Sequence, residues 1–360
     1  MEVSPFPYQG PLEPSQVVER RELVADLVER VTERRVTALL GPRRYGKTSV
    51  LHRVASELSE VTTVWVDLYE VASSADVAVR FDNALAAPTG KWHTTARNLA
   101  VTLSLNLGMV KVELAGPARQ RPDPAIVLSS TLDVLVRTAQ QQPTLLIIDE
   151  FSSIARVPGA AGLLRTAIQH HYRDLGLVFA GSHPSMMRTL FTDRAEPFYG
   201  QADLLEIGPL SAAALEETIR AGFEQTGRDA EGLAAFIYHF SGGHPQRSMQ
   251  LADASWRHWD AETSDSYWWA AGIDDVRRET SEGMERLYSG FERGERDVLR
   301  SVARSGSIYG AEADLLELAK GTASHARQTL LDSGDLLDID GELRVVDPLL
   351  ADWLRNRFSI

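Results

Sequence analysis

The stretch that decides the fold is Val36-Thr37-Ala38-Leu39-Leu40-Gly41-Pro42-Arg43-Arg44-Tyr45-Gly46-Lys47-Thr48-Ser49. Its first five residues form a short apolar run, which is typical of a buried strand. Residues 48–58 repeat apolar side chains at helical spacing. Between the two lies G-x-x-x-x-G-K-T, a loop whose backbone N–H groups and following helix N-terminus can converge on a phosphate. The sequence therefore predicts a strand, a phosphate-binding loop and a helix in succession.

The residue types in this loop fit a nucleotide with bound Mg²⁺. Lys47 would reach the β- and γ-phosphates, and the Thr48 hydroxyl would bind the metal ion. A glycine-rich turn with an incidental lysine is the alternative, but the predicted strand before the loop and the helix after it favour the phosphate site. We therefore assign nucleotide binding to the whole loop, which comprises Gly41, Pro42, Arg43, Arg44, Tyr45, Gly46, Lys47, Thr48 and Ser49.

Polar residues at the ends of two further apolar runs complete the predicted site. Residues 144–148 lead into Asp149 and Glu150. Asp149 would hold Mg²⁺, and Glu150 would polarise the attacking water. A solvated acidic turn is the alternative, which the neighbouring phosphate loop disfavours. Residues 176–180 end at Gly181 and Ser182, so Ser182 is a candidate catalytic residue that contacts the γ-phosphate or positions water, although serine also commonly forms turns.

The remaining pattern predicts an α/β fold with a parallel sheet, preceded by a proline-rich arm over the first sixteen residues. A second strand is predicted at 61–68, and helices at 18–31, 125–139 and 162–172. Alternating apolar residues predict a hairpin insertion near 99–116. We expect the P-loop core with its arm to span 1–207.

Beyond residue 207 the pattern becomes helical. A helical lid with a Trp-rich linker is predicted over 208–290, and a winged helix over 291–360. The winged-helix prediction rests on three helices at 298–304, 311–319 and 322–331, followed by two short strands around Asp340-Gly341.

Composition narrows the function classes. The 360 residues carry a formal charge of -13 and no cysteine, which disfavours a globally basic nucleic-acid binder and excludes disulfides. No apolar run approaches the roughly 18 residues of a membrane helix, and the first residues lack a signal-peptide pattern. These features predict a cytoplasmic protein. The adjacent His170 and His171 would point about 100° apart on a helix and make poor joint metal ligands.

The motifs resemble those of the archaeal-type ATPases, a branch of the AAA+/STAND class. The resemblance rests on residues 41–49, on Arg21-Glu22-Leu23 before them, and on the strand that ends at Asp149-Glu150-Phe151. Pro197-Phe198-Tyr199-Gly200 matches a later loop of the family. Gly243, His244 and Pro245 are similar to its G-x-P element. The resemblance covers nearly the whole chain.

What the resemblance implies is an AAA+ type P-loop ATPase core with ATP and Mg²⁺ as cofactors, a helical lid and a winged helix. It places Gly243, His244 and Pro245 near the adenine, and it implies that nucleotide state controls how the parts pack. Many members act as molecular switches, and many assemble on activation. Gln201 departs from the family, which often has an arginine there. Arg188 or Arg194 is a substitute candidate for a trans-acting finger.

Two features bear on the partner. Residues 291–360 contain nine Arg and Lys residues against thirteen Asp and Glu residues, and the predicted third helix offers only His325 and Arg327, which disfavours DNA binding. The tryptophans in the linker indicate either an interaction hot spot or, as we prefer, core between packed domains; they are Trp256, Trp259, Trp268 and Trp269.

Three functions are therefore consistent with the sequence. The first is a slowly hydrolysing ATP-dependent switch that signals to a protein partner. The second is a DNA-associated AAA+ assembly factor that oligomerises with ATP. The third is a nucleotide-binding scaffold with little hydrolysis. Motifs that separate ATP from GTP are not legible in the residues themselves.

Overall fold

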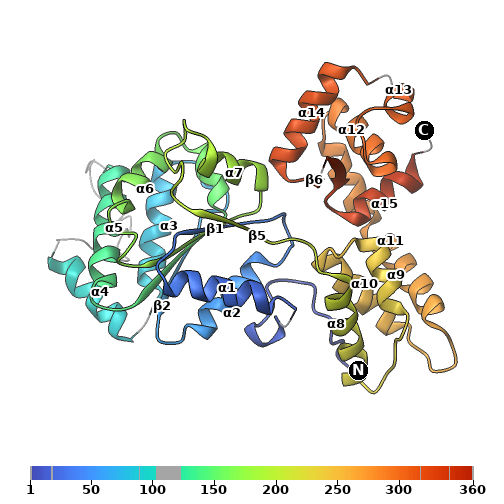
Figure 1. Ribbon diagram of the computed structural model, residues 1–360, viewed down its shortest axis with the longest axis horizontal. Helices are drawn as coiled ribbons and strands as arrows, with labels where there is room; N and C mark the ends of the chain where they lie inside the picture. Colours follow the sequence, from blue (N-terminus) through green and yellow to red (C-terminus); the bar gives the residue numbers. More distant parts are fainter. Residues whose placement is uncertain are drawn as a thin grey trace, which may run out of the picture.

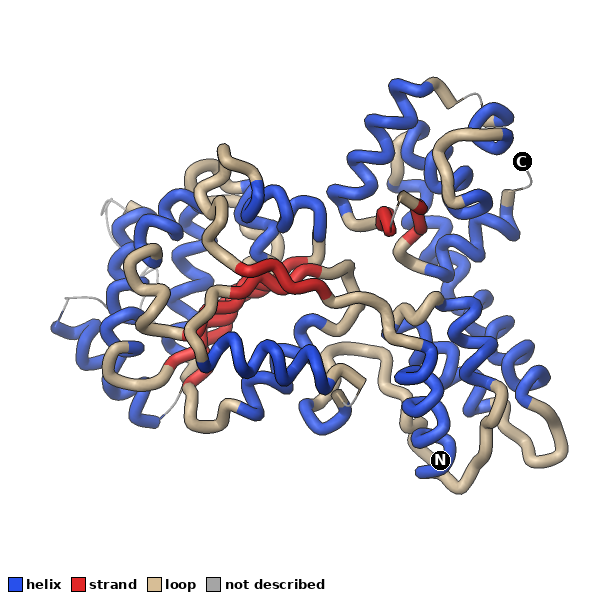
Figure 2. The backbone as a smooth tube through the Cα atoms, viewed as in Figure 1, coloured by secondary structure: helices blue, strands red, loops and turns tan. Residues whose placement is uncertain are grey.

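The computed structural model describes residues 2–17, 19–88, 90–102, 123–316, 318–339 and 341–358. Its centre is a five-stranded parallel sheet in the order β2-β3-β4-β1-β5 (Figures 1 and 2). The strands are β1 (Thr37–Leu40), β2 (Thr62–Asp67), β3 (Thr144–Asp149), β4 (Gly176–Gly181) and β5 (Asp203–Glu206). The predicted parallel-sheet α/β core is confirmed.

Helices cover both faces of the sheet, which explains the apolar runs in the strands. Alternate residues of β1 show the division: Ala38 and Leu40 face one layer, and Leu39 faces the other. The Leu39 side packs against α1 (Arg21–Thr32) and α2 (Lys47–Glu57). The opposite side packs against α3 (Ser74–Ala86), α4 (Gly90–Thr102), α5 (Pro124–Ala139), α6 (Ala160–Ile168) and α7 (Pro184–Thr192).

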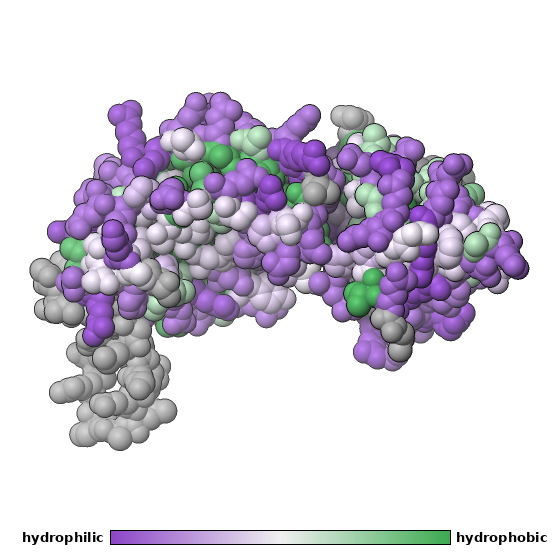
Figure 3. Space-filling view, turned by 90° about the horizontal axis from the view of Figure 1, so that it is seen from below, coloured by the Kyte–Doolittle hydropathy of each residue, from purple (hydrophilic) through white to green (hydrophobic). Residues whose placement is uncertain are grey.

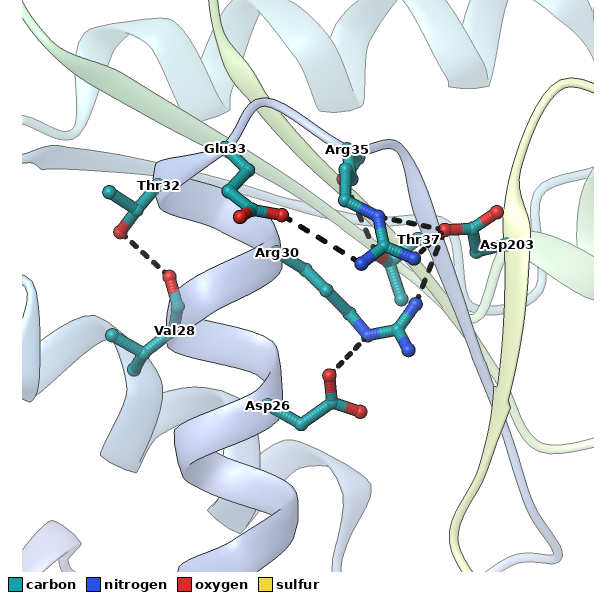
Figure 4. Close-up of polar contacts among 8 residues, drawn as sticks. All are labelled: Asp26, Val28, Arg30, Thr32, Glu33, Arg35, Thr37 and Asp203. Carbon is teal, nitrogen blue, oxygen red and sulfur yellow. Dashed lines mark hydrogen bonds and ion pairs between the residues drawn. The ribbon is translucent and has the colours of Figure 1, made fainter.

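The edge strand β5 lies where no strand is predicted. Its four residues read polar, apolar, apolar, polar, and none of them is fully buried. Arg30 and Arg35 both hydrogen-bond the Asp203 carboxylate at the start of β5, and Arg30 also binds Asp26 (Figure 4). The strand is held by backbone pairing with β1, by the half-buried Leu204 and Leu205, which pack against the two layers, and by this ion-pair cluster.

The predicted hairpin lies largely outside the described residues, which omit 103–122. Residues 99–102 belong to the end of α4. The predicted hairpin is wrong at 99–102, and the helices α3 and α7, with α4 up to residue 98, lie where the pattern predicts no element. The predicted strands at 36–40, 61–68, 144–148 and 176–180, and the helices at 48–58 and 125–139, are confirmed to within two residues.

Four helices follow β5: α8 (Ala212–Gln225), α9 (Leu233–Ser241), α10 (Pro245–Arg257) and α11 (Asp265–Gly290). Trp256 and Trp268 are buried among them, and Trp259 and Trp269 pack against the same cluster. The tryptophans therefore belong to the apolar core of these helices, and their predicted place between two packed domains stays a prediction. The start of the N-terminal arm also lies here, because Phe6 is buried against Phe223 at a ring distance of 5.5 Å. The short 3-10 turn Pro14–Gln16 later in the arm lies against α2 instead, where Arg53 Nη1 donates to the Pro14 carbonyl.

The last elements form a C-terminal lobe, which we define as α12 (Arg293–Ser305), α13 (Ala311–Leu315), α14 (Lys320–Ser333), β6 (Leu336–Ile339), β7 (Glu342–Val345) and α15 (Pro348–Arg357). Figure 1 shows it in orange and red above α8–α11. Strands β6 and β7 pair antiparallel. This order agrees with three helices and a hairpin, and the winged-helix assignment and the domain boundaries stay predictions.

The surface seen in Figure 3 is mainly hydrophilic, with apolar residues in small groups. Within the described ranges, no helix has both the length and the apolar character needed to cross a membrane.

Candidate functional site

The predicted phosphate loop connects β1 to α2 at the carboxyl edge of the sheet. Gly41 passes so close to the segment after β5 that a Cβ there would lie 2.2 Å from Ile207 Cγ2. Gly46 takes the left-handed conformation, with φ of 87°, immediately before α2. Gly41 is therefore required because there is no room for a Cβ, and Gly46 is favoured because its φ is positive. Both are the glycines of the motif. The loop delivers Lys47 and Thr48 to the first turn of α2.

Lys47 lies inside this loop. Its Nζ donates hydrogen bonds to the Gly41 and Pro42 carbonyl oxygens, each at 2.8 Å. The side chain is buried, and burial lowers the pKa of Lys47 to about 8, against the opposing charges of Glu150 and Asp149. A buried ammonium bonded only to carbonyl groups is well placed to exchange them for phosphate oxygens.

Thr48 and Asp149 come together as the sequence predicts. The Thr48 hydroxyl donates to Asp149 Oδ2 at 3.2 Å, although the residues are 101 positions apart. Burial raises the pKa of Asp149 above its usual range. A hydroxyl beside a buried carboxylate is an all-oxygen donor set that fits Mg²⁺. These two residues would hold the ion.

Glu150 and Ser182 also meet. Strand β4 lies between β1 and β3, so Ser182 at its end lies between the phosphate loop and the acidic pair. The Ser182 hydroxyl donates to Glu150 Oε1 at 2.5 Å. Glu150 itself has a φ of 50°, a conformation uncommon for residues other than glycine. Such an outlier is often found at functional sites.

The Gly243-His244-Pro245 motif reaches the phosphate loop from the lid. The His244 ring lies edge-on to Tyr45 at 5.0 Å between centroids. Burial lowers the pKa of His244 to about 4, and burial raises the pKa of Tyr45 to about 12, so both rings are neutral at pH 7. The Gly243 carbonyl accepts a hydrogen bond from Leu210 N at 2.8 Å, which fixes the motif to the start of the lid.

The structure adds a charged cluster that the sequence did not predict. Arg247, in the first turn of α10, binds Asp347 of the C-terminal lobe through Nε at 3.0 Å and through Nη2 at 2.5 Å. Arg44 of the phosphate loop lies 3.9 Å from the same carboxylate. The phosphate loop, α10 and the C-terminal lobe therefore meet at Asp347. A separation of 100 residues leaves no local pattern by which this pair could be found.

The other candidates are less central. Arg188 hydrogen-bonds Glu206 at the surface. Gln201 donates to the Tyr199 carbonyl, and no contact of the Arg194 side chain is seen within the described part of the chain. His171 pairs with Asp174 at 2.8 Å, and among the described residues no group of three or more His, Cys, Asp or Glu side chains is arranged to hold a metal.

A phosphate loop after β1, with an acidic strand end two strands away across β4, defines a P-loop NTPase core of AAA+ type. The family model for the ATPase domain predominantly from Archaea matches residues 18–251, and the chain belongs to this family. The resemblance seen in the motifs is thereby confirmed. No protein with a curated description matches the chain.

Solved structures share the fold along the whole chain. A Walker-type ATPase of Pyrococcus abyssi matches with a TM-score of 0.72 and 18% identity, over 98% of this chain and 99% of that one. The ORC2 protein of Aeropyrum pernix, solved with ADPNP and ADP, gives 0.58 and 16%, over 98% and 96%. The ORC1 protein of the same organism, solved with DNA, gives 0.51 and 13%, over 98% and 94%.

Proposed function

We propose that the protein is a cytoplasmic, Mg²⁺-dependent ATPase that turns over slowly and acts as a molecular switch toward a protein partner. The single observation that carries the proposal is the convergence of Lys47, Thr48, Asp149, Glu150 and Ser182 at one edge of the sheet, in a chain of the ATPase family. The domains proposed for the switch are the core 1–207, the lid 208–290 and the winged helix 291–360.

The chemistry follows from positions and charges. Lys47 would leave the Gly41 and Pro42 carbonyls and bind the β- and γ-phosphates. Glu150 would orient the water that attacks the γ-phosphorus and accept its proton, and Ser182 would fix the Glu150 carboxylate or the water. Mg²⁺, held at Thr48 and Asp149, would supply positive charge to the phosphate oxygens.

Switching is supported by the contacts that join the three parts. Tyr45 and Arg44 of the phosphate loop touch His244 of the lid and Asp347 of the lobe. A nucleotide that changes the position of the loop would therefore act on both. We place the adenine beside Gly243, His244 and Pro245, which lie against the loop.

The second candidate function is that of a DNA-associated AAA+ assembly factor, which is supported by the fold that the chain shares with an ORC1 protein solved with DNA. The net negative charge of residues 291–360 disfavours DNA binding by the lobe. Arg327 on α14, the one arginine of the predicted recognition helix, is bound to Asp338 of β6. A third candidate, a scaffold with little hydrolysis, follows if none of Arg173, Arg188 and Arg194 reaches the γ-phosphate of its own or a neighbour's site.

The test is ATP turnover by the wild type and by Glu150→Gln, with and without duplex DNA, while light scattering reports particle size. We expect slow turnover that DNA does not change, constant size, and a loss of at least about 100-fold in kcat for Glu150→Gln with unchanged ATP affinity. Growth in size and stimulation by DNA would instead support the assembly factor. Wild-type turnover in Glu150→Gln would remove Glu150 from the proposed role.

A further inference from the structure

The C-terminal lobe touches the strand end that carries Ser182. We propose that this contact positions the base for hydrolysis: residues 332–334 of the lobe hold residues 182–185, and through Ser182 they hold Glu150. The inference rests on the proposed ATP hydrolysis and adds to it the part of the molecule that regulates it. Asp332 and Ser185 are positioning residues in this scheme, since neither touches the reacting atoms.

A hydrogen bond between two helices is the first observation. The Ser185 hydroxyl, in the first turn of α7, donates to Asp332 Oδ1 in the last turn of α14 at 2.7 Å. The two residues are 147 positions apart. Ser185 lies only three residues beyond Ser182, so this bond ties the lobe to the short segment that follows β4.

Close packing at Gly334 is the second observation. Gly334 ends α14 in the left-handed conformation, with φ of 78°. A Cβ at this position would lie 3.1 Å from the Ser182 carbonyl oxygen and 3.8 Å from His183 Cδ2. The turn after α14 therefore supports the backbone of the residue whose hydroxyl binds Glu150.

The segment is held from its other side as well. His183 Nδ1 lies 3.1 Å from the hydroxyl oxygen of Ser152, a fully buried residue two positions after Glu150. Ser182 and His183 thus each bond to the chain that begins at Glu150, while both pack against Gly334. Displacement of the lobe would remove the contacts that hold Ser182 and His183 from the side of Gly334.

A catalytic carboxylate that moves by about 1 Å can lose on the order of 100-fold in rate. Loosening the contact should therefore lower kcat. The phosphate loop does not take part in the Ser185–Asp332 bond, so the KM for ATP should stay nearly constant. A kcat effect without a KM effect separates positioning from general damage to the nucleotide site.

The experiment compares ATP turnover of the full chain with that of Asp332→Ala, Ser185→Ala and the double variant. We expect kcat to fall about 5- to 10-fold in each single variant, with KM within about twofold, from partial loss of positioning. The double variant should be no worse than either single one, because all three break the same bond. Asp332→Asn keeps an acceptor oxygen and should retain most of kcat.

Two control variants lie on the same helices and do not touch Asp332. The exposed Thr329 hydroxyl donates to the His325 carbonyl within α14, and the exposed Thr189 hydroxyl donates to the Ser185 carbonyl within α7. Thr329→Ala and Thr189→Ala should turn over like the wild type. A kcat for Asp332→Ala and Ser185→Ala that equals or exceeds the wild-type value, with turnover still dependent on Glu150, would overturn the inference alone. A wild type without Glu150-dependent turnover would overturn the proposed function and the inference with it.

Discussion

Lys47 is the residue on which nucleotide binding depends most directly. Its ammonium is buried and bonded to two carbonyl oxygens of its own loop, ready to exchange them for phosphate. A charge-assisted hydrogen bond contributes about 1.5–3 kcal/mol, which corresponds to roughly 10- to 150-fold in affinity. We therefore expect Lys47→Ala to weaken ATP binding by that factor, as measured by titration calorimetry.

The matched control is Lys91→Ala, which removes an exposed lysine from the start of α4 on the far side of the fold. Its ATP affinity should equal that of the wild type. Unchanged affinity in Lys47→Ala itself would remove the phosphate-loop assignment.

Residues within one short motif could be predicted because their roles depend on neighbours in sequence. Lys47 and Thr48 follow Gly46 into a helix, and Asp149 ends an apolar strand, so sheet topology alone brings them together. Arg247, Asp332 and Asp347 could not be predicted, since their partners lie 100 or more positions away. Asp347 before Pro348 is recognisable only as a helix N-cap.

At the scale of elements, the N-terminal arm depends on close packing with α8. A Cβ at Gly222 would lie 2.5 Å from two ring atoms of Phe6, which is buried. Gly222→Ala should therefore displace Phe6 and release the arm, although alanine favours a helix by about 1 kcal/mol. We expect faster chymotrypsin cleavage after Tyr8, followed by mass spectrometry.

Gly283→Ala is the control for this substitution. Gly283 lies exposed inside α11, and a Cβ added there would meet no atom within 4 Å outside its own helix backbone among the described residues. Here the helix preference acts alone, so stability should rise by up to about 1 kcal/mol and cleavage after Tyr8 should stay unchanged. Equal cleavage rates in the two variants would show that Phe6 does not anchor the arm.

An apolar run or a clear helical face made most elements predictable, but α3 and α7 each bury an apolar face and were still not predicted. Strands β1 to β4 lie between two helical layers and therefore read as largely apolar stretches. Strand β5 is a four-residue edge strand with only two apolar residues, and α11 lies in a stretch that was predicted only as a Trp-rich linker. In both, long-range contacts decide the structure.

At the scale of the whole molecule, Asp347 connects the three parts of the chain. The C-terminal lobe and helices α8–α11 share one hydrophobic cluster, so the lobe is not an isolated unit. On the phosphate-loop side the lobe makes polar contacts, through Asp347 with Arg247 and Arg44, beside the apolar Leu337 and Val346, which pack against the cluster that contains Tyr45. Polar contacts of this kind can exchange with phosphate, which a buried apolar interface cannot.

Asp347→Asn tests this junction while keeping the helix cap, because asparagine caps as well as aspartate. The substitution would remove the counter-charge of Arg247. Because the Arg247 side chain is only 7% exposed, water cannot replace that charge. Breaking such a buried pair costs about 3 kcal/mol. We expect the apparent Tm to fall by several degrees, and amide exchange to rise around residues 244–250 and 342–350.

The pH dependence and a second variant separate charge from general damage. Burial alone would raise the pKa of Asp347, but the hydrogen bonds and charge of Arg247 outweigh it and hold the pKa below its usual range. A lowered carboxyl pKa contributes stability that is complete above about pH 4 and is lost as pH falls through the folded-state value. The Tm difference between wild type and Asp347→Asn should therefore be constant from pH 7 to about pH 4 and shrink below that.

Asp352→Asn removes the partner of Arg277, whose side chain is 43% exposed and can bind water instead. Its effect should be smaller, about 1 kcal/mol or less. Equal losses in the two variants would mean that Asp347 stabilises only the lobe, and that core, lid and lobe are joined by their apolar contacts.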